Sequence, residues 1–480
     1  MPSLTRDWYN FRRPDVRTHY GGVTEVNTNP SRGMWSSRAG FILAAAGSAV
    51  GLGNIWGFPT QVGQGGGAGF VVIYLACVFL ICAPIMAGEI ALGRRARLSP
   101  VGSFAALAPG RRWWLVGALG VLAGVGILSF YSVIAGWAVA YVWFAATGAV
   151  SGTPDDIGRF FSEFTGNGLV SAALALFVIG TTAAVLLGGV RTGIERVTKA
   201  LMPILVLLLI ALALRAVTLP GAGAGLTYYL SPDLSALADI GVFTAALGQA
   251  FFSLSLGMGC ILTYGSYFSR QDGIASAALW IVALDTSIAL LAGFIIFPVG
   301  FSIAGFDPTT SGPGLIFTVL PRLFAEFPGG QLFGGAFFLL LSVAALTSTI
   351  SLLEVPVSHC VDALGWTRTK AVAAVAGAVS VLAIPSALGN GAVGALTSLP
   401  GLGMGFLDLM VNVWNEFALP IGGCLTAIFI GRVWGARLAL DELRAEGAWF
   451  PAPEAWTFLI RWVCPVAIAS VLLAFLWSLL

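Results

Sequence analysis

The sequence predicts an all-α polytopic membrane protein with eleven transmembrane helices. Of its 480 residues, 58% are hydrophobic and only 10% are charged, whereas soluble proteins carry about a quarter charged residues. The mean hydropathy is +0.91. Apolar stretches of about 20 residues, the length needed to cross a bilayer, recur along the whole chain. A surface so poor in charge excludes a soluble enzyme.

The apolar stretches set the order of the expected helices. The eleven expected spans cover residues 39–63, 70–93, 113–147, 169–188, 193–218, 240–268, 274–300, 334–363, 370–390, 405–431 and 456–480. The stretch 306–333 is apolar but interrupted by Pro and Gly, so we expect a helical hairpin that covers one face of the bundle.

The chain divides into three parts on this basis. Residues 1–34 form a polar, basic tail without the apolar segment of a signal peptide. Residues 35–434 are expected to form a ten-span core, and residues 435–480 a cytoplasmic loop with the eleventh span. The tail is interpreted as a solvated arm, with contact to anionic lipid as the alternative.

The basic residues predict the orientation. With the N-terminus inside, all but three of the 24 Lys and Arg residues lie on the cytoplasmic side, the exceptions being Arg159, Arg215 and Arg322. This bias favours a cytoplasmic N-terminus in the inner (plasma) membrane. Eleven spans then place the C-terminus outside.

Several functions are excluded by composition. The net charge of +2 gives no sign of nucleic-acid binding. The six cysteines lie in or beside apolar stretches and predict buried thiols, not disulfides or a zinc site. The two histidines, His19 and His359, have no nucleophile or metal-ligand partner at a useful spacing. We therefore expect no enzyme activity and no organic cofactor.

Two spans contain glycines where a helix should continue. The first reads AAAGSAVGLGNIWGFP and the sixth FFSLSLGMGCILTY. They open two five-span halves, about 35–218 and 240–434. Paired broken helices are typical of secondary transporters with inverted repeats, because unwound backbone needs polar partners that hydrocarbon does not offer. The alternative is that these glycines only permit close helix packing.

Three segments carry a family resemblance: WSSRAGFILAAAGSAVGLGNIW, GQAFFSLSLGMG and AALTSTISLL. They closely resemble the neurotransmitter:sodium symporter family, over about residues 32–480, and eleven spans match a common bacterial variant. The resemblance implies sodium-coupled import of amino acids by alternating access, with two sodium ions, an amino-acid substrate and the lipid bilayer as partners. Oligomeric state is not predicted.

The resemblance implies two sodium sites. The first would use the Ala49 carbonyl with Asn54, Ser253 and Asp285. The second would use the carbonyls of Gly47, Val50 and Ala344 and the hydroxyls of Thr347 and Ser348. Read alone, these hydroxyls could simply bond to the preceding helical turn.

Asp285 is also a functional candidate in its own right, because a bare carboxylate inside a span is costly. Many family members have Asn at this position and bind chloride nearby. Because Asp285 can supply the negative charge itself, we expect chloride-independent transport. The structural alternative is a carboxylate whose hydrogen bonds are satisfied by neighbouring hydroxyls.

The resemblance places the substrate at the two breaks. Free N–H groups at half-helix N-termini suit a carboxylate, and the Tyr131 hydroxyl would add a donor. Amine-transporting relatives carry Asp where this chain has Gly51, so the substrate must bring its own carboxylate. An apolar wall without charge predicts neutral, hydrophobic or aromatic L-amino acids, although Ile127 and Leu352 can also be interpreted as plain core. The expected substrate-binding residues are Ser48, Ala49, Gly51, Gly53, Ile127, Tyr131, Phe252, Ser253, Ser255, Met258, Ser348 and Leu352.

The resemblance also implies a cytoplasmic gate and a span-five element that unwinds. The expected gating residues are Arg32, Trp35, Ser266, Tyr267 and Asp362, together with Gly193 and Pro203. Without the resemblance, Pro203 would be an ordinary kink. Glu89, in GEIALGRR, matches a buried carboxylate of the family and is interpreted as structural.

The outer gate departs from the family pattern. Gly57 stands where an Arg is common, and Val411 where its Asp partner is expected. Outer closure is therefore expected to rest on Tyr131 and Phe252 packing over the substrate. This departure motivates the alternative of a non-transporting, amino-acid-binding membrane sensor with the same fold.

Overall fold

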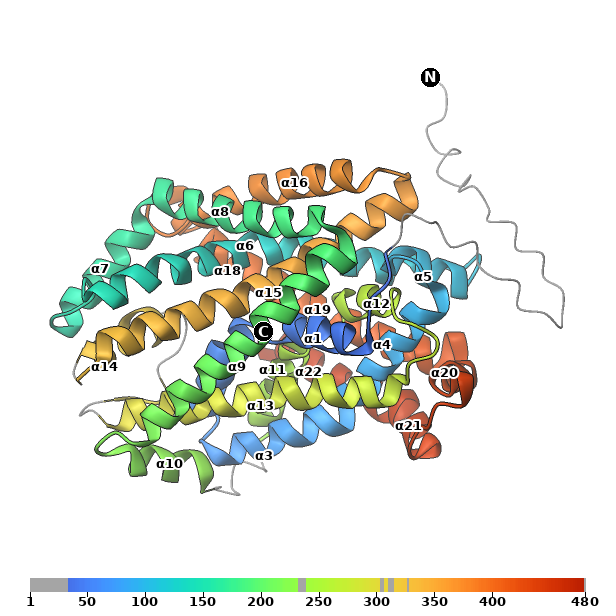
Figure 1. Cartoon of the computed structure of the whole chain (residues 1–480), viewed down its shortest axis with the longest axis horizontal. Helices are drawn as coiled ribbons and strands as arrows, with labels where there is room; N and C mark the ends of the chain where they lie inside the picture. Colours follow the sequence, from blue (N-terminus) through green and yellow to red (C-terminus); the bar gives the residue numbers. More distant parts are fainter. Residues whose placement is uncertain (1–32, 232–238, 303–305, 310–314, 326–327, 479–480) are drawn as a thin grey trace.

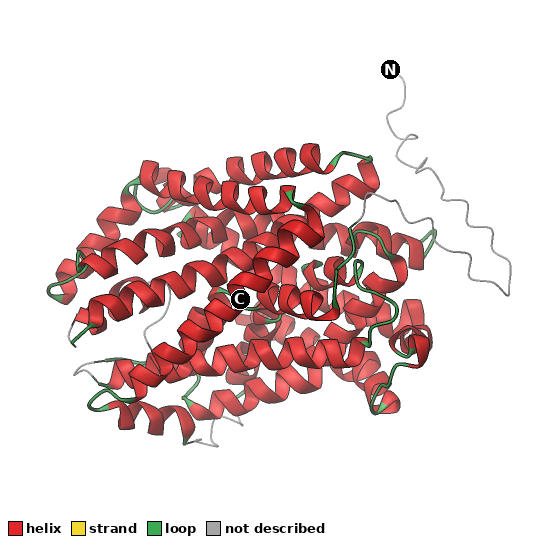
Figure 2. Ribbon diagram, viewed as in Figure 1, coloured by secondary structure: helices red, strands yellow, loops and turns green. Residues whose placement is uncertain are grey.

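The computed structural model is an all-helical bundle (Figures 1 and 2), and it describes residues 33–231, 239–302, 306–309, 315–325 and 328–478. Helices and short turns make up these residues, which include no β-strand. The predicted all-α fold is confirmed.

Nine helical segments among the described residues are long and apolar enough to cross a membrane. They are Ala68–Ala96 (α3 Ala68–Cys77, η3 Val78–Cys82, α4 Ala83–Ala96), α6 Trp114–Thr147, α8 Gly168–Leu187, Val190–Val217 (η4 Val190–Glu195, α9 Arg196–Val217), α13 Ile274–Phe301, α15 Gly330–Leu364, α16 Arg368–Leu388, Phe406–Leu443 (α18 Phe406–Val411, η7 Asn412–Ala418, α19 Leu419–Ile428, η8 Phe429–Gly435, α20 Ala436–Leu443) and Pro453–Ala474 (within α21 Pro453–Phe458, η10 Leu459–Val463 and α22 Cys464–Ser478).

Two further apolar segments are broken. The first joins α1 (Arg38–Ala49) to η2 (Gly53–Gly57) and α2 (Phe58–Gln64) through a bend of 52°. The second joins α11 (Ile240–Ser253) to α12 (Cys260–Gly265) through six non-helical residues. These segments fall on the eleven predicted ones. The count of eleven crossings remains a prediction, because the 14-residue α11 is too short to cross alone.

Short helices occupy the connections: α5 (Pro100–Leu107), α7 (Pro154–Gly166), α10 (Ala222–Leu230), α14 (Leu320–Ala325) and α17 (Gly394–Thr397). The predicted hairpin over 306–333 is described only in part, as one helical stretch in which η6 (Leu315–Val319) continues into α14. Figure 1 shows α7, α10 and α14 at one end of the bundle and α5, α12, α20 and α21 at the other.

The bundle is held together by close helix contacts. The long helices α6 and α15 pack along each other and against α8 and α16 (Figure 1). On the other side, Gly93 of α4 faces the Leu262 carbonyl of α12, and Gly265 of α12 faces the Ile90 backbone. A Cβ at Gly93 would lie 2.0 Å from that carbonyl oxygen. Such small residues let helix backbones approach within a membrane.

A buried ion pair joins two helices of the bundle. Arg94 and Glu442 are 0% and 4% exposed, and they join α4 to α20 through a 2.7 Å Nε–Oε1 contact. Arg94 also donates to the Asp272 carbonyl at 2.8 Å. The six cysteines are free thiols, and all but Cys360 are buried. The prediction of buried thiols therefore holds for the other five.

Candidate functional site

The break in the first span frees backbone groups, and side chains take them up. Helix α1 ends at Ala49, and Val50 is extended at φ −69° and ψ 113°. The N–H of Gly51 donates to Asn54 Oδ1 at 3.0 Å, and that of Leu52 donates to Tyr131 Oη at 3.0 Å. The broken helix is thus tied to α6 through Tyr131.

The break between α11 and α12 contains three residues with positive φ, namely Ser255 (54°), Gly257 (77°) and Gly259 (79°). The Gly257 N–H donates to Glu89 Oε1 at 2.9 Å, and Glu89 is 1% exposed. This contact is what the structural interpretation of Glu89 requires. The Ser255 hydroxyl donates to the Ser48 carbonyl at 2.9 Å, so the two breaks are in direct contact.

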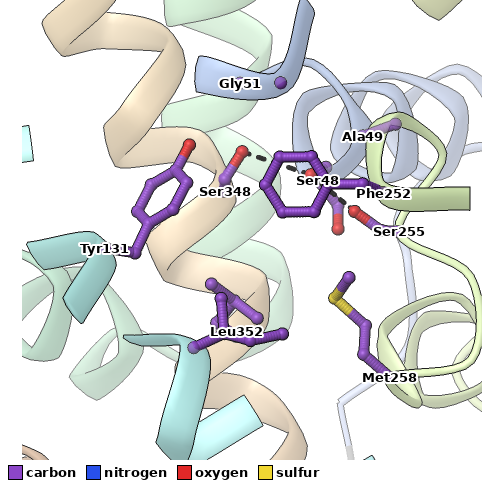
Figure 3. Close-up of a pocket in the computed structure, with 11 residues that line it drawn as sticks. Ser48, Ala49, Gly51, Tyr131, Phe252, Ser255, Met258, Ser348 and Leu352 are labelled. Atoms are coloured by element: carbon purple, nitrogen blue, oxygen red, sulfur yellow. Dashed lines mark hydrogen bonds between the residues drawn. The ribbon is translucent and has the colours of Figure 1, made fainter. Parts of the chain in front are cut away.

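A cavity lies between the breaks (Figure 3). It is lined by Ser48, Ala49, Gly51, Gly53, Ile127, Tyr131, Phe252, Ser255, Met258, Ser348 and Leu352. Each of these residues belongs to the predicted substrate set. Ser253, the remaining member, is absent from the lining and belongs to a polar cluster beside it. None of these eleven described residues is acidic or basic.

Gly51 is crowded by the polar side of this cavity. A Cβ there would lie 2.4 Å from Ser348 Oγ and 2.7 Å from Tyr131 Oη (Figure 3). Both hydroxyls are engaged: Tyr131 accepts from Leu52, and Ser348 donates to the Ser48 carbonyl at 3.2 Å. Any side chain at position 51 would therefore displace a hydroxyl from its partner.

The first polar cluster joins the breaks to α13. Asn54, Ser253 and Asp285 are 0%, 1% and 0% exposed. Asn54 Nδ2 lies 2.9 Å from Ser253 Oγ, 3.1 Å from the Asp285 carbonyl and 2.7 Å from Asp285 Oδ1. Ser253 donates to Asp285 Oδ2 at 2.8 Å. Three of the four residues predicted for the first sodium site thus form one buried set rich in oxygen, which suits a hard cation.

The second cluster lies between α15 and the end of α1. Thr347 Oγ1 lies 2.9 Å from the Ala344 carbonyl and 3.5 Å from the Val50 carbonyl. Ser348 Oγ donates to the carbonyls of Val50 and Ser48, each at 3.2 Å. These hydroxyls therefore do more than bond to their own helix. Gly47 faces the same cluster, because its Cβ position is 3.4 Å from Thr347 Cβ.

The predicted cytoplasmic gate is partly described. Arg32 lies outside the described residues. Trp35 is 8% exposed, and its Nε1 donates to the Tyr264 carbonyl at 3.0 Å. Asp362 accepts from the Ser99 N–H at 2.6 Å. The hydroxyl of Ser266, which follows α12, donates to the Thr263 carbonyl of that helix at 2.6 Å.

A buried ion pair, Glu354 with Arg368, lies beside this gate. The sequence analysis did not predict it. Glu354 is 0% exposed and accepts from Tyr267 Oη at 2.8 Å. It also accepts from Arg368 Nη2 at 2.6 Å and Nη1 at 3.2 Å. Arg368 Nε in turn donates to the Leu186 carbonyl at 2.6 Å. Glu354 could have been noticed as an acid within an apolar span.

The predicted span-five element is helical throughout. Gly193 lies in η4 with its Cβ position 2.1 Å from the Val185 carbonyl oxygen, and Pro203 lies inside α9. Glu195, also missed in the sequence, is 1% exposed and binds the start of α1. It accepts from the Ser36 N–H at 2.7 Å, from the Ser37 hydroxyl at 3.3 Å and from Lys199 Nζ at 2.6 Å.

Comparison with known proteins agrees with this arrangement. Residues 32–153 and 156–479 match the model of the sodium:neurotransmitter symporter family. The chain is 37% identical over 445 residues to the sodium-dependent transporter YhdH of Bacillus subtilis, covering 92% of this chain and 97% of that protein. It is 32% identical to the sodium-dependent transporter MJ1319 of Methanocaldococcus jannaschii, covering 92% and 89%.

A solved structure is also similar. The crystal structure of MhsT in complex with L-phenylalanine superposes with a TM-score of 0.84 at 44% identity, covering 92% of this chain and 99% of that one.

Fold, broken helices and oxygen-rich clusters together define a sodium-dependent membrane transporter, not an enzyme. The chain belongs to the sodium:neurotransmitter symporter family. It is therefore a multi-pass membrane protein that uses sodium and binds a small-molecule substrate.

Proposed function

We propose that this chain imports neutral, hydrophobic or aromatic L-amino acids together with sodium, without a requirement for chloride. The observation that carries the proposal is the cavity between the two breaks. Its polar side offers the Tyr131 and Ser348 hydroxyls beside Gly51, and its opposite side is apolar, with Ile127 and Leu352. This division suits a zwitterion with an apolar side chain.

The crowding of the cavity supports the same substrate class. The crowding at Gly51 leaves no room for a carboxylate side chain to pair with an amine. Met258 is unbranched and polarisable, so it can adapt to side chains of different shape. MhsT, the similar solved protein, was crystallised with L-phenylalanine.

The two polar clusters are proposed as sites for two sodium ions that are carried with the substrate. Asn54, Ser253 and Asp285 would hold one ion with the Ala49 carbonyl. Thr347 and Ser348 would hold the other, with the carbonyls of Gly47, Val50 and Ala344. Asp285 brings the negative charge, which is the basis for proposing that chloride is not needed.

We also propose an inner-membrane location with the N-terminus in the cytoplasm and the C-terminus outside. The three basic residues assigned to the outer side support this orientation. Arg159 lies in α7, Arg322 in α14 and Arg215 in the last turn of α9, which leads into α10. In Figure 1, α7, α10 and α14 lie at one end of the bundle, opposite α5, α12 and α20.

Uptake by purified protein in liposomes tests the proposal. With an inward sodium gradient, radiolabelled L-phenylalanine and L-leucine should accumulate, and choline in place of sodium should abolish accumulation. Gluconate in place of chloride should leave the rate unchanged. Lysine and glutamate should not compete. Sodium-dependent binding without accumulation would instead favour the amino-acid sensor.

A further inference from the structure

Gln249 of α11 spans the gap between the two broken segments. It is 6% exposed, and its Nε2 donates to the Gly53 carbonyl at 2.8 Å. That carbonyl also accepts the N–H of Phe58 within the first span. The contact lies on the side of the cavity away from Trp35, because Trp35 precedes α1, α1 leads to the break and η2 continues beyond it.

Glycine at position 57 makes this contact possible. A Cβ on Gly57 would lie 2.9 Å from Gln249 Oε1 and 3.5 Å from Nε2. One helical turn earlier, a Cβ on Gly53 would lie 2.9 Å from the ring of Phe252. Gly53 and Gly57 are four residues apart on the first span. They leave space for Phe252 and Gln249, which are three residues apart on α11. Phe252 lines the cavity, and Gln249 lies one turn further from it.

We propose that Gln249 is a positioning residue that closes the outer end of the substrate cavity. The proposal rests on the function proposed above. The positions of the family's charged outer pair hold Gly57 and Val411 here, and the amide of Gln249 fills the space that a longer side chain at 57 would need. Its hydrogen bond to the Gly53 carbonyl fixes α11 against the first span and keeps Phe252 over the substrate.

This closure differs physically from an ion pair. An amide–carbonyl hydrogen bond carries no net charge, so salt does not screen it as it screens exposed charges. It contributes about 0.5–1.5 kcal/mol, which corresponds to a 2- to 12-fold change in an equilibrium or rate constant. Opening the cavity outward separates α11 from η2 and breaks this one bond.

The test compares Gln249→Met, which keeps length but removes the donor, with Gln61→Met, the same change one turn beyond Gly57. We measure the dissociation rate of radiolabelled L-phenylalanine in saturating sodium. Gln249→Met should release it about 2- to 12-fold faster, and a cooperative melting transition shows that the variant is folded. Gln61→Met should match the wild type.

A double-mutant cycle adds specificity. Gly57→Ala pushes the Gln249 amide away and should by itself also speed release. In the Gln249→Met background, Gly57→Ala should add little, because the contact it disturbs is already lost. Fully additive effects, or an unchanged release rate in Gln249→Met, would overturn the proposal.

A measurement without substrate separates this proposal from the proposed function. Amide hydrogen exchange in sodium alone should be faster in Gln249→Met over residues 53–64 and 240–253, and unchanged over α16. If the wild type binds no amino acid, the proposed function fails, and exchange rates still decide the role of Gln249. Amide exchange in Gln249→Met that is as slow as in the wild type would contradict that role.

Discussion

Replacing Asp285 by asparagine removes a charge and keeps the shape of the side chain. In the wild type, Oδ1 accepts from Asn54 at 2.7 Å and Oδ2 accepts from Ser253 at 2.8 Å, with Asp285 0% exposed. The positive charge of a sodium ion at this cluster would be balanced by the Asp285 carboxylate, because the zwitterionic substrate brings no net charge.

The size of the effect follows from the loss of a charged partner. Polar interactions with a charged group contribute about 1.5–3 kcal/mol, equivalent to about 10- to 160-fold in affinity. We therefore expect the half-saturating sodium concentration for binding of L-phenylalanine to rise by about that factor in Asp285→Asn. Amino-acid affinity at fixed sodium should fall as well, since coupling between two ligands is reciprocal.

The assay titrates sodium against choline at constant ionic strength and follows binding of radiolabelled L-phenylalanine. Asp155→Asn, on the exposed surface of α7, is the matched control and should behave as the wild type. Uptake is also compared in chloride and gluconate. Ala289, one turn along α13 from Asp285, becomes Ser in the double variant Asp285→Asn/Ala289→Ser, in which chloride should restore uptake. An unchanged sodium titration in Asp285→Asn, or a wild type that requires chloride, would refute this reasoning.

Three further substitutions have defined outcomes. Gly51→Ala forces a methyl group against Ser348 and Tyr131 and should weaken binding of L-phenylalanine about tenfold or more; unchanged affinity in equilibrium binding would contradict the crowding argument. Glu354→Gln leaves the Arg368 charge without its carboxylate and should reduce the free energy of unfolding by about 3 kcal/mol, with partial recovery when Arg368→Gln is added, as thermal denaturation in detergent would show. Glu195→Gln replaces one acceptor oxygen at the start of α1 with a donor and removes the charge that faces Lys199. It should lower stability by about 1–3 kcal/mol, whereas a melting temperature equal to that of the wild type would show that this anchor is dispensable.

The sequence was sufficient for the fold because hydrocarbon imposes simple rules on it. Apolar length located the helices, and glycines beside Ser and Asn located both breaks. The short helices were harder to predict. For example, α7 and α10 contain too few apolar residues in succession to be separated from loops by hydropathy alone.

The cavity lining and the two polar clusters beside it were predicted from family motifs, and the contacts of Gln249, Glu195 and Glu354 were not. Gln249 is separated by 196 residues from Gly53, and Glu195 by 159 residues from Ser36. Such contacts depend on how the broken spans cross, which periodicity does not specify. The polar residues themselves were visible within apolar spans, and buried polar groups generally have partners. That rule identifies candidates such as Gln249 and Glu354 but does not name their partners.

The placement of the thiols decides how the moving parts of this carrier can be labelled. Cys77, Cys82, Cys260, Cys424 and Cys464 are buried, and Cys360 is half-buried. Polar maleimides react from water and should reach these native positions slowly. A cysteine introduced beside Gly57 or Trp35 can then be followed in an otherwise natural chain, without first replacing the native residues that pack its core.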